Sequence, residues 1–179
     1  MKKVLIISTS LRKDSNSDYL AKAFQDGAIA AGHSAELVTL RGKTIQYCKG
    51  CFACQQIGHC VIKDDSTEIV EKMKDADVIV WATPVYYYSM SGQMKTLIDR
   101  ANCLYSADYK FRDVYGLITA TEDEDYTPQG TIQGIQGWVD CFKKATLKKC
   151  LFAGGVTDQG EILKFKDYLD KAYKMGQGV

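Results

Sequence analysis

Several features that would assign this sequence to other classes of protein are scarce or missing. Only two of its 179 residues are proline and two are histidine, and it has no long hydrophobic run. The apolar run after Lys2 and Lys3 breaks at Ser8, which is too early for a signal peptide or a membrane-spanning helix. We therefore expect a cytoplasmic protein with no membrane partner.

An excess of charge of one sign is also missing. The chain has 23 Lys and Arg against 22 Asp and Glu, a formal net charge of +1, and the lysines are scattered. Because nucleic-acid-binding domains concentrate basic residues on one face, we expect no nucleic-acid partner. Neither His33 nor His59 lies in a His-x-x-His or Glu-x-x-His pattern, which argues against a histidine-bound metal and against hydrolytic catalysis.

Linkers, internal repeats and low-complexity tracts are absent, so we expect residues 1–179 to form one domain. Short apolar runs typical of buried strands alternate with helical patterns along the chain. This alternation predicts right-handed βαβ units in an α/β fold, a three-layer sandwich whose five-stranded parallel sheet has the order 2-1-3-4-5 and helices on both faces. The predicted strands are Lys3–Ser8, Ala35–Leu40, Asp77–Ala82, Val114–Ala120 and Cys150–Ala153.

The helical patterns have recognisable ends. Leu20, Phe24 and Ala28 form one apolar face of the first helix, which we expect to stop at Gly32. Asp65-Ser66-Thr67-Glu68 resembles a capping box that opens the second helix. The remaining predicted helices begin near Ser91, span 131–147, and run from Ile162 to Met175 with Gly176 as the terminator.

The loop after the first strand, residues 8–17, is predicted to bind a phosphate. Its hydroxyls, amide and backbone N–H groups lie at the start of a helix, where the helix dipole favours an anion. Neither G-x-x-x-x-G-K-[ST] nor G-x-G-x-x-G occurs, so a monophosphate is favoured over a triphosphate or a dinucleotide. The alternative is an ordinary loop in which Ser or Asn caps the helix. The predicted ligands are Ser10, Arg12, Ser15, Asn16 and Ser17.

A second loop, Thr83–Ser89, follows the third strand. In a sheet of the predicted order, ligands bind at the carboxyl ends of strands one and three, so the two loops should share one crevice. Tyrosine faces stack on flat rings, and a phosphate beside a flat ring indicates flavin mononucleotide (FMN). The alternative is that the tyrosines are surface or interface aromatics. The other predicted cofactor-binding residues are Pro84, Val85, Tyr86, Tyr87, Tyr88, Ser89, Thr119 and Ala120.

Seven cysteines, an odd number, in a chain of this length favour thiols or metal ligands over a disulfide framework. Cys48, Cys51, Cys54 and Cys60 have the spacing Cys-x2-Cys-x2-Cys-x5-Cys within the long connection 41–63. Such a set holds a 4Fe–4S cluster or a zinc ion. The alternative is that Cys51, Cys54 and Cys60 pack as small apolar residues beside the flavin, near a subunit interface. We expect core positions for Cys103, Cys141 and Cys150.

Three blocks together resemble the flavodoxin-like NAD(P)H-dependent FMN reductase family, including its iron–sulfur flavoprotein branch. The resemblance spans nearly the whole chain, although many relatives have Gly-Ser-Pro-Arg where this chain has Thr9-Ser10-Leu11-Arg12. The blocks are Ser10-Leu11-Arg12 with Asn16-Ser17; Cys51, Cys54 and Cys60-Val61-Ile62-Lys63-Asp64-Asp65; and Thr83-Pro84-Val85-Tyr86 with Met90-Ser91, Met94-Lys95 and Asp99-Arg100.

The resemblance implies non-covalent FMN, reduction by NADH or NADPH, and a homodimer or homotetramer with part of the flavin site at a subunit interface. It implies that Asp99 and Arg100 form a structural or interface ion pair, which is worth little at an exposed site. Three functions stay open: an NAD(P)H oxidoreductase that reduces a small acceptor such as a quinone or free flavin, an iron–sulfur electron carrier that serves a redox partner protein, and a non-catalytic FMN-binding module. In the first, the flavin carries the chemistry and no side chain need be catalytic.

Overall fold

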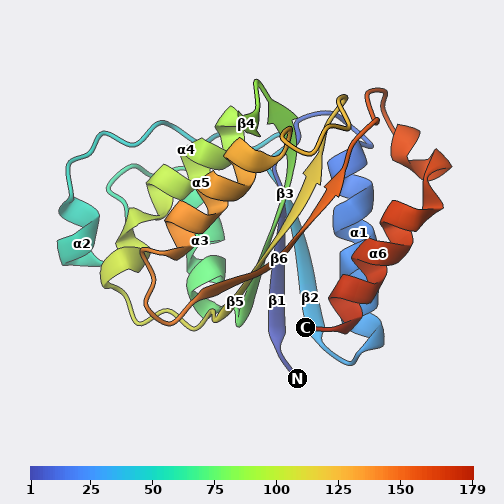
Figure 1. Ribbon diagram of the computed structural model, residues 1–179. Coiled ribbons are helices and arrows are strands. Elements are labelled where there is room, and N and C mark those ends of the chain that lie inside the picture. The colour runs from blue at the N-terminus through green and yellow to red at the C-terminus, as the bar shows by residue number, and fades with distance from the viewer.

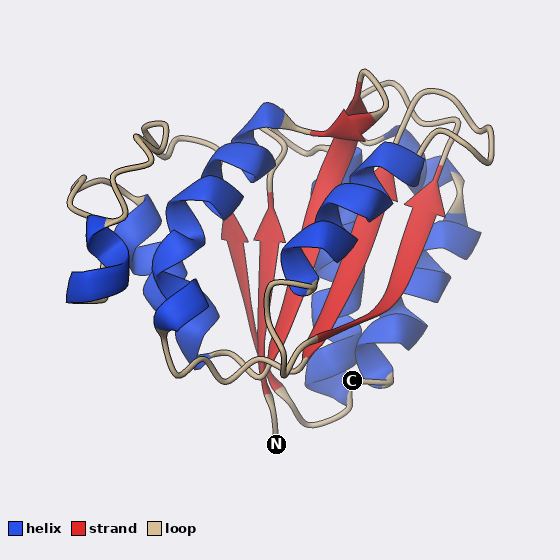
Figure 2. Ribbon diagram, turned by 60° about the vertical axis from the view of Figure 1, so that its left-hand side comes forward, coloured by secondary structure: helices blue, strands red, loops and turns tan.

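A computed structural model describes residues 1–179 as a parallel sheet with helices on both faces (Figure 1, Figure 2). The sheet has the order β2-β1-β3-β5-β6, and a short β4 pairs antiparallel with β3. When the short β4 is left out and the five parallel strands are numbered along the chain, this order is the predicted 2-1-3-4-5. The strands are β1 (Lys3–Ser8), β2 (Ser34–Thr39), β3 (Val78–Tyr86), β4 (Ser89–Met90), β5 (Asp113–Thr119) and β6 (Thr146–Ala153).

The helices form two layers. The pair α1 (Asn16–Ala30) and α6 (Lys166–Gln177) covers one face of the sheet, and α3, α4 and α5 cover the other (Figure 1). None of the helices is both long and apolar enough to cross a membrane. The other helices are α2 (Ala53–Ile57), α3 (Ser66–Asp75), α4 (Gly92–Arg100) and α5 (Gln129–Val139), with the 3-10 helices η1 (Ala101–Ser106) and η2 (Glu161–Lys164).

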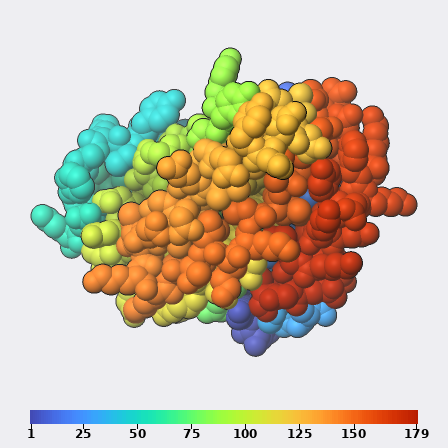
Figure 3. Space-filling view, in the orientation of Figure 1, coloured from blue at the N-terminus to red at the C-terminus, as the bar shows by residue number.

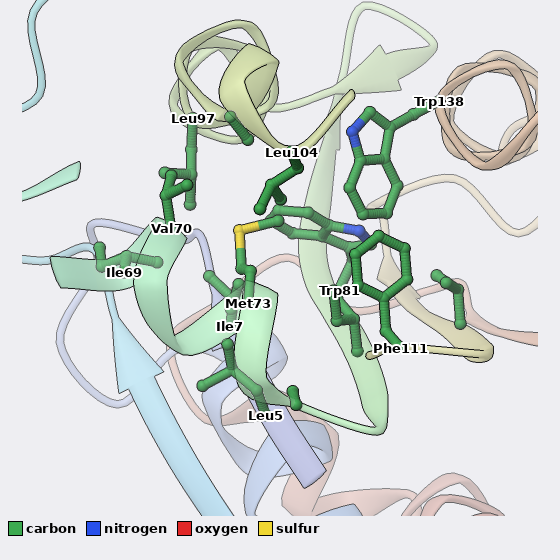
Figure 4. Packing of buried hydrophobic residues seen from close by; sticks show 14 of the residues in the cluster. Leu5, Ile7, Ile69, Val70, Met73, Trp81, Leu97, Leu104, Phe111 and Trp138 are labelled. Atoms are coloured by element: carbon green, nitrogen blue, oxygen red, sulfur yellow. The ribbon is translucent and has the colours of Figure 1, made fainter. Parts of the chain in front are cut away.

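Strand pleating divides the buried residues between two cores. Ile6 faces the core beneath α1 and α6, whereas Ile7 and Trp81 face the core beneath α3, α4 and α5. In this second core the Trp81 ring meets the Trp138 ring edge-on at 5.6 Å, and Trp138 stacks on Phe111 at 5.6 Å (Figure 4). Both faces of β1 and β3 are therefore buried, as in other parallel sheets.

The third strand is longer than predicted. It does not end at Ala82 but continues to Tyr86, so most of the predicted loop Thr83–Ser89 belongs to β3 and β4. Pairing with β1 stops at Ala82, which leaves one edge of β3 free and lets Pro84 lie in the strand without a lost hydrogen bond. The loop is reduced to a tight turn at the tip of a hairpin that projects from the molecule (Figure 3).

The predicted capping box at Asp65 is wrong, because the Asp65 side chain makes no cap hydrogen bond. Asp64 supplies the cap instead and accepts hydrogen bonds from the Ser66 N–H at 3.0 Å and the Ser66 hydroxyl at 2.7 Å. A capping box is present at α1, where Ser15 and Asp18 satisfy each other's backbone N–H groups. The sequence pattern therefore placed the cap of α3 at Asp65, one residue after Asp64, which supplies it.

Helix boundaries in the C-terminal part also differ from the prediction. The helix predicted over 131–147 ends at Val139, and β6 begins at Thr146, earlier than expected. The last predicted helix is divided into η2 and α6, and Gly176 lies inside α6 instead of ending it. Gly176 is required by packing, because a Cβ there would lie 2.0 Å from the Phe24 carbonyl oxygen of α1.

Candidate functional site

The carboxyl ends of β1, β3, β5 and β6 surround one cavity of about 130 Å³. Ten predicted cofactor-binding residues line it, so the two sequence signals do converge there. Tyr87, Tyr88 and Ser89 do not line it, because they form the hairpin tip beyond Tyr86. Thr121, Val156 and Thr157 complete the lining and were not predicted from the sequence. Val156 and Thr157 come just after the fifth parallel strand, and this position could have identified them as lining residues. The ten residues are Ser10, Arg12, Ser15, Asn16, Ser17, Pro84, Val85, Tyr86, Thr119 and Ala120.

Two of the predicted phosphate ligands use their side chains within the fold. The Ser15 hydroxyl accepts from the Asp18 N–H at 3.1 Å. The Asn16 amide donates to the Asp158 carbonyl at 3.0 Å and accepts from the Ile162 N–H at 3.0 Å, which ties α1 to the segment after β6. Both side chains therefore hold the walls of the cavity together, and any contact that they make with a ligand stays a prediction.

Other polar groups of the cavity keep free hydrogen-bonding capacity. The Ser17 and Thr119 hydroxyls are 2.9 Å apart, and because they share one hydrogen bond, one of the two protons stays free. The exposed Arg12 guanidinium donates to the Thr157 carbonyl at 2.8 Å, and the Ser10 hydroxyl accepts from the Arg12 N–H at 3.3 Å. These groups and the first N–H groups of α1 are donors of the kind that bind an anion, and phosphate binding here stays a prediction.

The hairpin tip beside the cavity has a strained backbone. Tyr87 and Tyr88 have φ values of 49° and 61°, and Tyr86 pairs with Ser89 on either side of them. Positive φ at both central residues belongs to a type I′ turn, which normally contains Asn-Gly. Each non-glycine residue in this conformation costs about 1–3 kcal/mol, and such strain is concentrated at functional sites. The Tyr88 hydroxyl also donates to Glu122 at 3.1 Å, which links the tip to the segment after β5.

The four clustered cysteines line a second, mostly apolar cavity of about 430 Å³. Cys48 and Cys51 are exposed, Cys54 is buried and Cys60 is partly buried; all are free thiols. No three His, Cys, Asp or Glu side chains lie close enough together to hold a metal ion. The donor set nevertheless suits a cluster chemically, because four unpaired thiols and the buried Arg100 side chain border one cavity.

The expected ion pair between Asp99 and Arg100 is wrong. Asp99 pairs with Lys95 at the surface, whereas Arg100 is 1% exposed and pairs with Asp64 at 2.6 Å and 3.1 Å. Burial alone would raise the pKa of Asp64. Hydrogen bonds from Arg100, the Gln46 N–H and Ser66 instead lower the pKa of Asp64 to about 2.

We expect the free energy of unfolding to fall in acid because of Asp64. The pKa of Asp64 is lower in the folded chain than in the unfolded chain, so ionised Asp64 stabilises the fold. This stabilisation is fully present above about pH 4 and is lost as the pH falls through about 2. The loss should be about 2 kcal/mol by linkage. Urea unfolding at pH 6, 4, 3 and 2 should show this decline in the wild type and in the surface control Asp99→Asn. An equal decline in Asp64→Asn would contradict the assignment.

The remaining cysteines differ in burial. Cys103 is buried, as predicted, whereas Cys150 is only partly buried and not a full core residue. Burial raises the pKa values of both thiols to about 11. The prediction that Cys141 is a core residue is wrong, because α5 ends at Val139 and Cys141 is exposed. Cys141 also borders the cavity of the four clustered cysteines.

Residues 2–127 match the family described as NADPH-dependent FMN reductase. An iron–sulfur flavoprotein of Methanosarcina thermophila is 31% identical over 156 residues, 87% of this chain and 82% of that protein. One of Methanocaldococcus jannaschii is 33% identical over 76% of this chain and 70% of that protein. One of Archaeoglobus fulgidus is 38% identical over 62% of this chain, and the match spans only 54% of that protein.

Solved structures agree with the fold. The NAD(P)H:quinone oxidoreductase from Methanothermobacter marburgensis superposes with a TM-score of 0.71 at 17% identity, covering 99% of this chain and 96% of that one. An azoreductase from Bacillus anthracis has a TM-score of 0.74 at 15% identity and full coverage of both chains. Identities this low show the flavodoxin-like fold alone. The family match and the two iron–sulfur flavoproteins with broad coverage are stronger evidence, because they rest on sequence similarity over most of the chain. The chain therefore belongs to the NADPH-dependent FMN reductase family.

Proposed function

We propose that this NAD(P)H-dependent flavin oxidoreductase binds FMN in the cavity at the carboxyl ends of β1, β3, β5 and β6, and passes electrons to a small, flat acceptor such as a quinone or free flavin. The observation that carries the proposal is the convergence in one cavity of the α1 N-terminus, Arg12, and the strand end Pro84–Tyr86. Pro84 lies 68 residues after Asn16, the first residue of α1.

The phosphate of FMN is assigned to the polar end of the cavity. The Ser10 and Ser17 hydroxyls are buried there, and Arg12 is the cation that reaches them from the surface. A helix N-terminus with a guanidinium binds a phosphate through N–H donors and favourable charge. Ser15 and Asn16 contribute by fixing the position of the first turn of α1.

The flavin ring is assigned to the open end beside Pro84, Val85 and Tyr86. FMN held there would supply the redox chemistry, which is hydride transfer from a nicotinamide and electron transfer to an acceptor. The protein orients the ring and excludes water from one side of it. None of the residues that line the cavity is a His, Cys, Asp, Glu or Lys, which is consistent with a site whose residues bind and orient the cofactor.

Replacing Arg12 by alanine should weaken FMN binding by about 1.5 kcal/mol, roughly tenfold in Kd, the lower end for a hydrogen bond to a charged group because Arg12 is exposed. Lys13→Ala is the matched control, since it removes an exposed cation from the same loop. Flavin fluorescence titration measures both Kd values. Equal Kd values for Arg12→Ala and wild type would remove Arg12 from the phosphate site.

A second candidate function is supported by the cysteine cavity. We propose that Cys48, Cys51, Cys54 and Cys60 hold a 4Fe–4S cluster, which would supply single-electron transfer, so that the protein serves as an electron carrier for a redox partner. Two observations support it: all four thiols border one cavity, and the relatives with broad coverage are named iron–sulfur flavoproteins. Zinc at the same cysteines is the competing occupant.

Anaerobic purification followed by a visible spectrum and iron, sulfide and zinc analysis tests this second candidate. We expect about four irons and four sulfides per chain in the wild type, loss of both in Cys60→Ser, and retention in the matched control Cys150→Ser. Flavin absorption without iron would exclude the cluster and leave the flavin oxidoreductase as the remaining candidate function. Flavin that NADH and NADPH both fail to bleach would favour a non-catalytic FMN-binding module.

We also propose a homodimer or homotetramer. Large aromatic side chains are exposed beside both cavities, and a single copy leaves them in water. They are Tyr47, Phe52, Tyr86, Tyr87, Tyr88 and Tyr105. Sedimentation equilibrium measures the assembly directly, and a monomer at all concentrations would contradict it.

A further inference from the structure

The ion pair between Arg100 and Asp64 lies at the base of the cysteine loop, defined as residues 47–61. We propose that Arg100 is a positioning residue of this loop: with Asp64 it clamps the two ends of the loop together, and it presents its remaining N–H to an anionic sulfur ligand set in the cavity. The second part rests on the proposed iron–sulfur site, whereas the first part does not.

Both ends of the loop are attached to the same guanidinium. One terminal nitrogen of Arg100 donates to the Gln46 carbonyl at 2.8 Å, and the other donates to the Ile62 carbonyl at 2.9 Å. Each also donates to Asp64, which accepts from the Gln46 N–H at 2.9 Å as well. Gln46 and Ile62 directly flank the loop, so one buried ion pair closes it.

Lysine cannot replace arginine in this arrangement. The clamp uses two nitrogens of one planar group to reach two carbonyls and a carboxylate at the same time, whereas an ammonium is a point charge on a flexible stem. Both charged groups are almost fully buried, with 0% and 4% of the side chains exposed. Removing either partner alone would leave an uncompensated charge in the interior.

One donor of Arg100 is left over. Its Nε–H is buried and has no hydrogen-bond partner, and Arg100 lines the same cavity as the four cysteines. A buried donor without a partner is unfavourable, and an ion or ligand that accepts from it is one of the explanations for such a group. Thiolate sulfur accepts hydrogen bonds, and such donors tune the reduction potentials of iron–sulfur clusters.

The position of Arg100 links the two candidate sites. It is the last residue of α4, and Ser91 caps the other end of this helix. The Ser91 N–H donates to the Thr83 hydroxyl of β3, and the Ser91 hydroxyl lies 3.0 Å from that of Thr9. One rigid helix, about 14 Å long, therefore runs from the carboxyl ends of β1 and β3, beside the proposed flavin site, to the clamp.

The clamp is tested first in metal-free protein. Amide hydrogen exchange should be at least about tenfold faster in residues 47–61 of Arg100→Lys than in wild type, because the ends of the loop are released. The rates in β1 and β3 and the FMN Kd should stay the same. Lys95→Arg, on the exposed face of the same helix, is the matched control and should leave the loop unchanged. Wild-type exchange of the loop in folded Arg100→Lys would overturn the clamp.

A second variant keeps the test valid if Arg100→Lys does not fold. The double substitution Asp64→Asn with Arg100→Gln removes both charges and leaves no unpaired ion in the interior. It should show the same faster exchange, confined to the loop and the residues that flank it. Unchanged exchange in this variant would also overturn the clamp.

The sulfur contact is tested in protein reconstituted with iron and sulfide. We expect Arg100→Lys to lose iron to a chelator about ten times faster and to have a lower cluster midpoint potential than wild type. An unchanged potential would overturn the contact between Arg100 and sulfur, even if the exchange result supports the clamp. A wild-type protein that binds no iron would overturn the iron–sulfur site and the sulfur contact, while hydrogen exchange would still decide the clamp.

Discussion

Gly27→Ala should lower the free energy of unfolding by about 3 kcal/mol, the upper end of the range for overpacking. A Cβ at Gly27 would lie 2.0 Å from the Tyr173 carbonyl oxygen of α6 and 2.9 Å from its carbonyl carbon. Both obstacles are backbone atoms, so no side chain can rotate away and the two helices must separate. The melting temperature should fall by about 6–12 °C.

The contact is reciprocal, which strengthens the prediction. Across the same helix pair, a Cβ at Gly176 would lie 2.0 Å from the Phe24 carbonyl oxygen. Glycine on each helix therefore lets α1 and α6 touch backbone to backbone. Gly176→Ala should have an effect similar to that of Gly27→Ala.

Gly137→Ala is the matched control, because Gly137 also lies in a helix but has no atom within 4 Å of the added Cβ. It should be neutral or stabilising by up to about 1 kcal/mol, since alanine has the higher helix propensity. Urea unfolding of the variants gives the comparison. If Gly27→Ala and Gly137→Ala unfold at the same urea concentration, the close contact between α1 and α6 is not formed.

Gly130→Ala should weaken FMN binding by about 1–3 kcal/mol, the range for overpacking that forces backbone to move. A Cβ at Gly130, in the first turn of α5, would lie 2.2 Å from the Tyr88 carbonyl oxygen. The added methyl must push the hairpin tip away from the helix. That tip already holds two tyrosines at positive φ, so its backbone has little freedom to adjust to the displacement.

Flavin titration measures this effect, and urea unfolding shows whether the fold survives. Gly134→Ala is an informative companion, because its added Cβ would meet only the end of the Met90 side chain, which can move. We expect Gly134→Ala to bind FMN nearly as wild type does. Equal affinities for Gly130→Ala and wild type would show that the hairpin tip does not take part in binding.

The convergence of the two loops could be predicted because it depends on topology. Alternating strands and helices imply a parallel sheet, and the carboxyl ends of its strands must lie at one edge. Residues next to a strand end, such as Ser10 and Ala120, therefore reach the same cavity. The four clustered cysteines border one cavity, and a cluster or zinc ion bound by them stays a prediction.

Other parts of the site could not be predicted, because they depend on contacts between distant backbone atoms. Thr121 lines the cavity, yet nothing in its local sequence distinguishes it from other loop residues. Gly130 lies just outside the helix predicted over 131–147, yet it is part of α5 and lets the hairpin tip lie on this helix. The partner of Arg100 was expected next to it in sequence and lies 36 residues away.

By itself, the sequence determined the order of the parallel strands, their sheet and the edge at which the cavity lies, because hydrophobic periodicity and βαβ handedness are local properties. Only the tertiary structure decided that Arg100 closes the cysteine loop, that α1 and α6 meet through glycine, and that Tyr87 and Tyr88 adopt positive φ. Each of these depends on which backbone atoms of separate segments come within contact distance. These contacts are set by the packing of whole helices and strands, and they produce no periodic pattern in the sequence.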